Sequence, residues 1–297
     1  MRTIDLESLR VFRTIVDEGG VIRAAAKLNR VQSNVTARVR QLEEHLGARL
    51  FRREGRTLRL SAEGQTLLTY ADRLLRLADE AVSEMRTGKP RGVFRLGALE
   101  STAGSRLPPI LSRYHSLHPD VVVELATATT GALLTRVMNF ELDGAFVSDP
   151  PAITNLGSRP VFEEKLVLIT PTSCTRMSGP ADMGRATLIA FGQGCSYRKR
   201  IEEWFGSANM IPERVLEFAS YQAMIACVAA GTGVAVVPQS ALAALRATRD
   251  VHQHALPPRF TRSTTHIVWH GHPSPALEGL LALLPKIRGS RPQPRNG

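Results

Sequence analysis

Basic side chains crowd into one short stretch of this chain, and the chemistry they could perform is the binding of a polyanion. Residues 20–60 hold ten arginines and lysines against three glutamates, an excess of seven within a net charge of +11 for the chain. Clustered cations of this kind neutralise the phosphates of a nucleic-acid backbone. A solvated basic surface is the alternative, because net charge alone does not name a partner.

The same stretch contains one helix whose outer face could read DNA bases. Val35, Val39, Leu42 and Leu46 recur at helical spacing and form an apolar stripe on a helix that ends at Gly47. The start of the opposite face is small, uncharged and hydrogen-bonding, which suits a helix in the major groove. The candidate DNA-contacting residues of this region are Arg23, Gln32, Ser33, Asn34, Thr36, Arg38, Arg40, Arg53 and Arg56.

Two shorter helices would hold the reading helix in place. Apolar residues recur at helical spacing from Leu6 to Val16, and Gly19 ends that helix. A second helix with three consecutive alanines follows and turns at Asn29 into the helix described above. Two helices joined by such a turn form a helix-turn-helix.

A β-wing is predicted directly after the reading helix. Residues 50–60 contain two short strand-like runs around Gly55. Arg56 would lie at the tip of this hairpin, where it could enter the minor groove of a duplex.

A long helix is predicted over residues 61–87. Its apolar residues follow a three-four repeat, which forms a seam of about three heptads. The seam residues are Gly64, Leu67, Ala71, Leu74, Ala78, Ala81 and Met85. The length and the polar remainder favour a helix that dimerises with a second copy of the chain, although a helix facing its own core has the same pattern. Residues 88–92 break the helix and are predicted to be a hinge.

From residue 93 the pattern changes to strands alternating with helices, which is typical of an α/β domain with mostly parallel sheets. The predicted strands are Val93–Ala98, Val121–Ala126, Gly144–Val147, Leu166–Pro171, Thr187–Phe191, Val215–Phe218, Val234–Pro238 and His266–Trp269. The predicted helices are Pro108–Leu117, Leu133–Phe140, Lys199–Phe205, Tyr221–Ala230 and Pro275–Leu284. Residues 291–297 are predicted to be a disordered tail.

Length and composition narrow the function classes. A chain of 297 residues is long enough for about two domains. No apolar run reaches the roughly 18 residues of a membrane span, and acidic residues stand where a secretory signal would be apolar. We therefore expect a cytoplasmic protein without a membrane partner. The widely spaced Cys174, Cys195 and Cys227 predict reduced thiols.

An enzyme and an exported solute-binding protein are the rival interpretations. The sequence lacks the usual nucleophile-elbow, zinc-protease and phosphate-loop motifs, and residues 231–233 lack the rest of a dinucleotide fingerprint. His252 and His254 are two apart, as are His270 and His272, and solvated loop histidines explain such pairs. We expect no catalysis, metal or cofactor. A solute-binding protein would have no use for the first 90 residues.

Several segments together resemble the LysR-type transcriptional regulators, over almost the whole chain. The shared N-terminal segments are LESLRVF (6–12), AAAKL (24–28), QLEEHLGARLFRR (41–53) and LSAEG (60–64). The later ones are Leu107-Pro108, His118-Pro119, LDGA (142–145), AAGTGVAVVP (229–238) and SPA (274–276). Their combination is specific, whereas no single segment would be.

The resemblance implies an α/β fold with an N-terminal winged helix-turn-helix and a two-lobed effector domain like the periplasmic binding proteins. The expected domains are the DNA-binding domain 1–60, the dimerising linker and hinge 61–92, and the effector-binding domain 93–290, with lobe I as 93–163 plus 267–290 and lobe II as 164–266. The implied partners are double-stranded promoter DNA, a small-molecule effector, and further copies in a homodimer or homotetramer. RNA polymerase is a further candidate.

Three positions depart from the pattern of the family. Gly20 and Val31 stand where capping serines are usual, and Val31 has no group that can cap a helix. Ala37 stands where a base-contacting arginine is frequent. We expect the fold to tolerate these changes and the target sequence to differ.

By the same resemblance, the effector would lie between the lobes, at strand ends and helix N-termini. The candidate residues are Ser101, Thr102, Thr129, Thr130, Cys195, Ser196, Tyr197, Ser220 and Tyr221. Helix capping is the alternative for the serines and threonines, and packing for the tyrosines. Cys195 could also sense oxidation. The hydroxyl-rich set predicts a small polar effector.

Overall fold

The computed structural model describes residues 4–54, 57–86, 90–177, 179–183 and 187–287. The chain divides into two compact units, residues 1–88 with 139–141 and residues 89–138 with 142–297. No helix within the described ranges is long and apolar enough to cross a membrane. The predicted tail 291–297, residues 88–89 of the predicted hinge and the wing-tip residue Arg56 lie outside the described residues.

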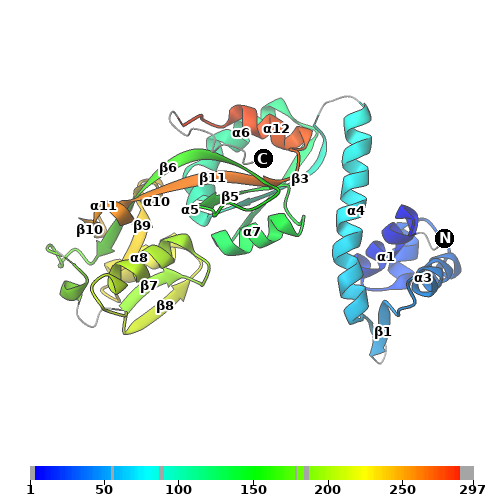
Figure 1. The fold of residues 1–297 in the computed structure, drawn as a ribbon, viewed down its shortest axis with the longest axis horizontal. Helices are drawn as coiled ribbons and strands as arrows, with labels where there is room; N and C mark the ends of the chain where they lie inside the picture. Colours follow the sequence, from blue (N-terminus) through cyan, green and yellow to red (C-terminus); the bar gives the residue numbers. More distant parts are fainter. Residues whose placement is uncertain (1–3, 55–56, 87–89, 178, 184–186, 288–297) are drawn as a thin grey trace. The chain divides into compact units, whose positions relative to one another are not determined.

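The described part of the first unit consists of helices and one antiparallel hairpin (Figure 1). The elements are α1 (Leu6–Glu18), α2 (Val21–Lys27), α3 (Gln32–Leu46), β1 (Phe51–Glu54), β2 (Thr57–Leu60) and α4 (Ala62–Arg86). This order is that of the predicted helix-turn-helix, wing and long helix.

Local backbone signals set the ends of the first three helices. Asp5 caps α1 by accepting a hydrogen bond from the backbone N–H of Ser8 at 2.8 Å, and Gly19 ends it with φ 66°. Asn29 has φ 51° in the turn between α2 and α3, and Gly47 ends α3 with φ 67°. Glycine and asparagine adopt this left-handed conformation with little strain. The predicted turn and helix ends are therefore confirmed.

The apolar stripe of α3 faces the core, as predicted. Val35 and Val39 are buried in a cluster that includes Ile15 of α1, and Leu42 is buried in a neighbouring cluster with Phe12. Burial of these side chains fixes the rotation of α3 about its axis, so its opposite face is turned to solvent.

The predicted dimer seam on α4 is wrong in its first half. Gly64, Leu67 and Ala71 are buried within the first unit, where Leu67 and Ala71 join the cluster around Phe12. A Cβ atom on Gly64 would lie 2.1 Å from the carbonyl oxygen of Leu50, so the close approach requires glycine. These residues pack in the core of their own chain, so a second copy of the chain cannot contact them.

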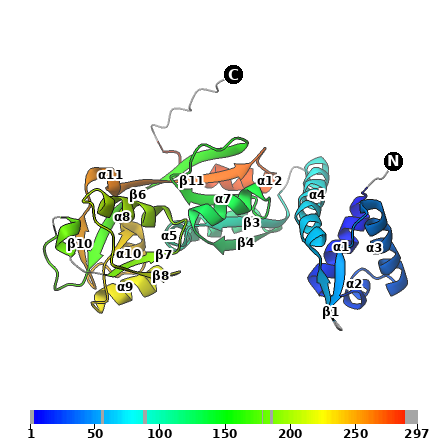
Figure 2. The same cartoon turned by 60° about the horizontal axis from the view of Figure 1, so that its bottom comes forward.

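A different stripe of α4 is exposed. Tyr70, Leu74, Leu77 and Ala81 recur at heptad spacing, and the side chains of Tyr70 and Leu77 are 54 % and 62 % exposed. This set, called here the outer stripe, shares only Leu74 and Ala81 with the predicted seam. Figure 2 shows that α4 continues beyond the level of α1.

The second unit is built on a seven-stranded sheet with the strand order β10-β6-β11-β5-β3-β4, in which β9 also pairs with β6. The strands are β3 (Gly92–Ala98), β4 (Val121–Thr127), β5 (Gly144–Ser148), β6 (Leu156–Thr170), β9 (Ala235–Pro238), β10 (His252–Ala255) and β11 (Arg262–His270). Strand β3 is parallel to β4 and β5, whereas every pairing of β6 and β11 is antiparallel. The prediction of mostly parallel sheets is therefore wrong for this sheet.

Strands β6 and β11 connect two lobes. They pair with each other over residues 156–165 and 262–270, after which β6 pairs with β9 and β10 (Figures 1 and 2). We call the part around β3, β4 and β5 lobe I, and the part around β9, β10 and the parallel pair β7 (Thr187–Phe191) and β8 (Arg214–Phe218) lobe II. The predicted strand Leu166–Pro171 is only the lobe II half of β6, and β10 was not predicted.

Helices cover both lobes. Lobe I carries α5 (Glu100–Ser105), α6 (Leu107–Leu117), α7 (Thr130–Met138) and α12 (Pro275–Leu283), and lobe II carries α8 (Ser196–Gly206), α9 (Tyr221–Ala229), α10 (Gln239–Ala244) and α11 (Pro258–Thr261). The five predicted helices are confirmed to within a few residues. The short helices α5, α10 and α11 were missed, because fewer than seven residues carry little periodicity.

Candidate DNA interface and effector cleft

The outer face of α3 presents mainly polar side chains to solvent. Gln32, Ser33, Asn34 and Arg40 are exposed, and the half-buried Thr36 donates its hydroxyl to the carbonyl oxygen of Gln32 at 2.9 Å. One shallow depression on this face is lined by Gln32, Ser33, Thr36, Ala37, Arg40, Gln41 and Glu44. The structure thus brings five of the predicted DNA-contacting residues onto one helix face or its N-terminal end.

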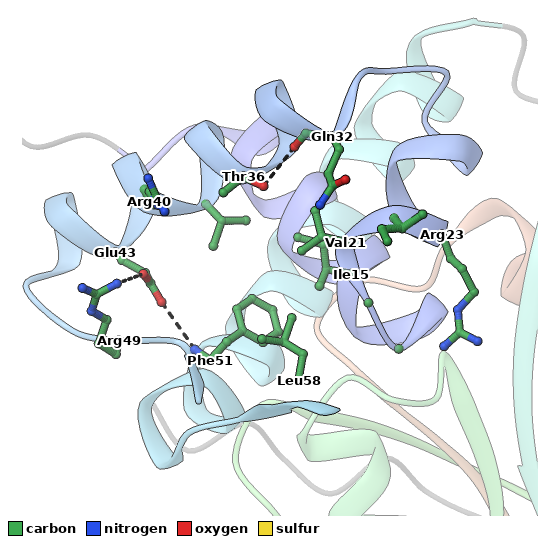
Figure 3. Close-up of a pocket in the computed structure, with 14 residues that line it drawn as sticks. Ile15, Val21, Arg23, Gln32, Thr36, Arg40, Glu43, Arg49, Phe51 and Leu58 are labelled. Carbon is green, nitrogen blue, oxygen red and sulfur yellow. Dashed lines mark hydrogen bonds and ion pairs between the residues drawn. The ribbon is translucent and has the colours of Figure 1, made fainter. Parts of the chain in front are cut away.

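A groove of about 1090 Å³ lies between α3, the start of α2 and the hairpin. Its lining is apolar at Ile15, Phe51 and Leu58, and Figure 3 shows Gln32 directed toward these side chains. Arg23 stands at the α2 end of the groove, and its side chain points away from the apolar lining.

Most basic side chains near α3 are paired with carboxylates. Ion pairs join Lys27 to Glu18, Arg30 to Glu7, Arg38 to Asp5, Arg49 to Glu43, and both Arg52 and Arg59 to Glu54. Arg23 and Arg40 form no ion pair with any described residue. Exposed ion pairs are weak and exchange readily, but an unpaired guanidinium has no carboxylate to release before it meets a phosphate. Arg40 is therefore the best-placed cation on α3.

Arg38 is held toward α1. Its guanidinium lies 3.4 Å from Asp5 Oδ1 and 3.5 Å from the Ser8 hydroxyl. Hydrogen bonds from the hydroxyl and the backbone N–H of Ser8 lower the pKa of Asp5, with a smaller contribution from Arg38, so this carboxylate stays charged. The side chains of Arg53 and Arg56 lie outside the described residues, and their roles stay predictions.

Glu43 has a structural role that its charge alone did not predict. Its side chain is 9 % exposed and accepts hydrogen bonds from the backbone N–H of Leu50 at 2.8 Å and from Arg49 at 3.0 Å. Figure 3 shows the contact with Arg49 and a further hydrogen bond, in which the backbone N–H of Phe51 donates to Glu43 at 3.4 Å. The carboxylate therefore ties the end of α3 to the start of the hairpin. A glutamate eight residues before the first residue of β1 gives no sequence signal of this role.

Hydrogen bonds join the two lobes of the second unit at their boundary. The backbone N–H of Gly131, at the start of α7, donates to the carbonyl oxygen of Gly194 in lobe II at 3.2 Å. On β6, Glu164 accepts hydrogen bonds from Arg106 of lobe I at 2.8 Å and from Ser240 of lobe II at 2.6 Å. Glu164 is nearly fully buried, so these two donors replace the water that would otherwise hydrogen-bond to its carboxyl group.

The predicted effector residues gather along this boundary in different environments. Ser101, Thr102, Thr130, Cys195, Tyr197 and Tyr221 are buried, and Thr129, Ser196 and Ser220 are half-buried. The Thr130 hydroxyl accepts from the backbone N–H of Ser148 at 3.2 Å, and Thr129 accepts from Ala132 at the start of α7 at 3.5 Å. The hydroxyls of these two threonines therefore accept hydrogen bonds within the protein, which agrees with the alternative of helix capping rather than ligand contact. Ser220 occupies the N-cap position of α9 but makes no side-chain cap bond.

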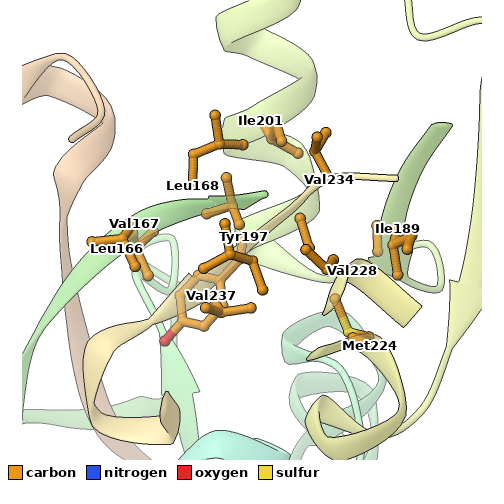
Figure 4. Close-up of a cluster of buried hydrophobic side chains, with 14 of the residues drawn as sticks. Leu166, Val167, Leu168, Ile189, Tyr197, Ile201, Met224, Val228, Val234 and Val237 are labelled. Carbon is orange, nitrogen blue, oxygen red and sulfur yellow. The ribbon is translucent and has the colours of Figure 1, made fainter. Parts of the chain in front are cut away.

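Hydroxyl groups without a hydrogen bond of good geometry distinguish the remaining candidates. The side-chain oxygens of Ser101, Ser196, Tyr197 and Thr265 are buried and form no hydrogen bond of good geometry with a described residue, although the Tyr197 hydroxyl lies near those of Ser101 and Ser263. The ring of Tyr197 packs in the lobe II core, and its hydroxyl points out of that cluster (Figure 4). A buried polar group left unpaired costs about 1–3 kcal/mol. A ligand that paired with these hydroxyls would recover that cost.

Burial keeps the titratable candidates in their neutral forms. It raises the pKa of Tyr197 and of Tyr221, so both hydroxyls remain protonated donors. Burial also raises the pKa of the Cys195 thiol, against smaller opposing effects of backbone N–H groups and Arg198. Because the thiolate is the reactive form, this environment does not favour oxidation sensing by Cys195.

Asp149 lies at the boundary between the lobes and was not predicted as a site residue. Asp149, directly after β5, accepts hydrogen bonds from Arg200 of α8 at 2.7 Å, from the Ser263 hydroxyl at 2.7 Å and from the Thr264 N–H at 2.9 Å. Ser263 also pairs with Ser148 at 2.6 Å between hydroxyl oxygens. Asp149 follows a buried strand, so the strand-end rule that selected Ser101 would have found it.

Comparison with known proteins identifies the architecture. Residues 6–65 match the family model for the bacterial regulatory helix-turn-helix protein of the lysR family, and residues 87–286 match the LysR substrate binding domain. The chain belongs to the LysR family. This LysR-type transcriptional regulator is 36 % identical over 263 residues to the regulator CzcR of Bacillus cereus, covering 88 % of this chain and 90 % of CzcR. It is 33 % identical over 266 residues to GltR of Bacillus subtilis, covering 89 % and 90 %.

Solved structures of LysR-type regulators share the fold. Full-length OxyR from Pseudomonas aeruginosa matches with a TM-score of 0.73 at 21 % identity, covering 95 % of this chain and 94 % of OxyR. CbnR in complex with its target DNA matches with a TM-score of 0.66 at 21 % identity, covering 95 % of this chain and 99 % of CbnR. At this identity the likeness concerns the fold alone.

Proposed function

We propose that this LysR-family regulator recognises promoter DNA with the outer face of α3, and that a small polar molecule bound between the lobes controls it. The observation that carries the DNA part is Arg40, an exposed cation without an ion-pair partner among the described residues, beside Gln32, Ser33 and Thr36 on one helix face. Guanidinium, amide and hydroxyl groups are the side-chain groups that read phosphates and base edges. The solved complex of CbnR, which has the same fold, with its target DNA supports a DNA-binding role for this chain.

The outer stripe of α4 would pair two copies of the chain. Tyr70 and Leu77 expose large apolar surfaces at heptad spacing, and burial against a second α4 would remove them from water. Two copies then present two α3 helices to a DNA site with an inverted repeat. Further pairing of dimers gives the homotetramer expected of the family, with RNA polymerase as an additional partner at the promoter.

The effector would bind at the unpaired hydroxyls of Ser101, Ser196 and Tyr197. These oxygens come from lobe I and lobe II, so one ligand could hydrogen-bond to both lobes. Such a ligand would shift the equilibrium between two arrangements of the lobes only if it bound one arrangement more tightly than the other. Because coupling between two sites is reciprocal, a ligand that changes the affinity for DNA has its own affinity changed by bound DNA to the same extent. This role is one of binding rather than catalysis, and a regulator that binds promoter DNA would act in the cytoplasm.

The experiment that tests the DNA assignment compares Arg40→Ala with Arg113→Ala. Both variants remove one exposed arginine, but Arg113 lies on α6 in the second unit. The probe is a duplex selected by the protein from a randomised library, with affinity measured at several salt concentrations. Arg40→Ala should weaken binding and lower the salt slope by about one unit per half-site. Unchanged affinity and slope in Arg40→Ala, or equal losses in both variants, would contradict the assignment.

A further inference from the structure

Val31 is an exposed apolar residue at the N-terminal end of α3, the helix whose outer face is polar. It occupies the N-cap position with φ −75° and ψ 145°, and its side chain is 62 % exposed. It directly precedes Gln32, which lines both the groove and the depression on α3. The valine therefore lies at the edge of the surface that the proposed function assigns to DNA.

The stability of the chain does not account for a valine at this position. Val31 makes no side-chain cap hydrogen bond to α3, whereas Ser, Thr, Asn or Asp there would stabilise the helix start. Its exposure means that little packing within the unit replaces the missing cap. A residue that departs from a local rule without an internal gain points to a function outside the folded chain.

The chemistry of the Val31 side chain limits which groups of DNA it could contact. A β-branched hydrocarbon cannot donate or accept a hydrogen bond, so it cannot bind a phosphate or a polar base edge. The apolar group that a base exposes in the major groove is the 5-methyl group of thymine. Ser33 and Ala37 are short, so no long side chain there holds the start of α3 away from the bases.

We propose that Val31 determines sequence preference by packing against the 5-methyl group of one thymine in each half-site of the bound DNA. This inference rests on the proposed DNA-binding role of α3 and adds a base preference to it. The contact replaces the lost helix cap with apolar burial that forms only in the complex. A serine at this position would instead cap the helix and give up the methyl contact.

Deoxyuridine scanning tests the contact directly, because deoxyuridine differs from thymidine only by the methyl group. The probe is the duplex selected from a randomised library, resynthesised with each thymine replaced in turn. The intact protein should lose about four-fold in affinity per half-site at one symmetry-related thymine pair, as expected for one buried methyl group. Val31→Ala and Val31→Ser should bind the thymine duplex more weakly and lose the sensitivity at that pair.

The serine variant separates recognition from folding. Because the introduced hydroxyl would supply the missing cap, the melting temperature of Val31→Ser should equal or exceed that of the original chain while its affinity falls. An intact protein insensitive to every replacement, a selected site without a thymine in each half-site, or unchanged sensitivity in Val31→Ala would overturn the inference and leave the role of α3 standing. An intact protein without preference for any selected duplex would overturn both.

Discussion

Arg200 and Asp149 join the two lobes of the second unit through a charge-assisted hydrogen bond of 2.7 Å. Arg200 lies on α8 of lobe II, and Asp149 follows β5 of lobe I. The same carboxylate also accepts from Ser263 and from the Thr264 N–H, both on the shared strand β11. One side chain thus connects three elements at the boundary where the effector would bind.

This relationship predicts a pH dependence of stability. Burial opposes the charge of Asp149, but the hydrogen bonds from Thr264, Ser263 and Arg200 outweigh it, and the pKa lies below its ordinary value of 3.8. The folded state therefore favours the carboxylate, and its contribution is present above pH 3.8 and lost as the pH falls toward the folded pKa. Denaturant unfolding across this range should show a steeper loss of stability for the original chain than for Asp149→Asn. Equal pH profiles would contradict this role.

Glu43→Ala should destabilise the first unit by about 1–3 kcal/mol, because it leaves the buried N–H of Leu50 without its acceptor. Glu43→Gln keeps an acceptor and should cost less. The control is Glu44→Ala, which removes an exposed carboxylate from the next position of α3. Denaturant unfolding measures all three variants. Equal stability of Glu43→Ala and Glu44→Ala would show that the contact to the hairpin contributes nothing.

Tyr197→Phe should affect stability and ligand binding in opposite directions. Removing a buried hydroxyl that forms no hydrogen bond of good geometry with a described residue should leave the ligand-free protein as stable as before, or more stable by about 1 kcal/mol. The same change should weaken an effector that pairs with the hydroxyl. A thermal-shift screen of small polar metabolites tests both effects. A variant that melts earlier without ligand, or that responds fully to a ligand of the original chain, would contradict the cleft assignment.

Leu77→Glu should separate the dimer without unfolding either unit. Leu77 is 62 % exposed and belongs to the outer stripe, so a carboxylate there meets water in the monomer but would be buried in a pair. Sedimentation should show a loss of dimer, and unfolding should show little change in the first unit. Leu67→Ala, at a position 8 % exposed, should instead destabilise the unit by about 2–5 kcal/mol. An unchanged oligomeric state in Leu77→Glu would exclude the outer stripe as the interface.

Local signals made much of the fold predictable. Gly19, Asn29 and Gly47 mark helix ends because their positive φ angles are a property of residue type. The part of β6 that pairs with β11, residues 156–165, was not predictable in this way. It is rich in polar residues such as Glu163 and Lys165, and it becomes a strand because β11, about 100 residues later, pairs with it.

Tertiary contacts account for what the sequence missed at the sites. The repeat on α4 identifies apolar positions but does not say which surface covers them. On this one helix Leu67 is buried in its own unit, whereas Leu77 is exposed. Arg200 and Asp149 are separated by 51 residues, so their contact depends on how the lobes close. The face of α3 was predictable, because burial of one stripe dictates the exposure of the other.

Sequence-specific DNA binding is the central claim, and a competition measurement tests it most directly. The intact protein is titrated with a duplex selected from a randomised library and with a scrambled duplex of the same composition, both at about 0.15 M salt. The selected duplex should bind at least about 1,000-fold more tightly than the scrambled one. Affinities for the two duplexes within about three-fold of each other would mean that only the phosphates are recognised, and would contradict the claim.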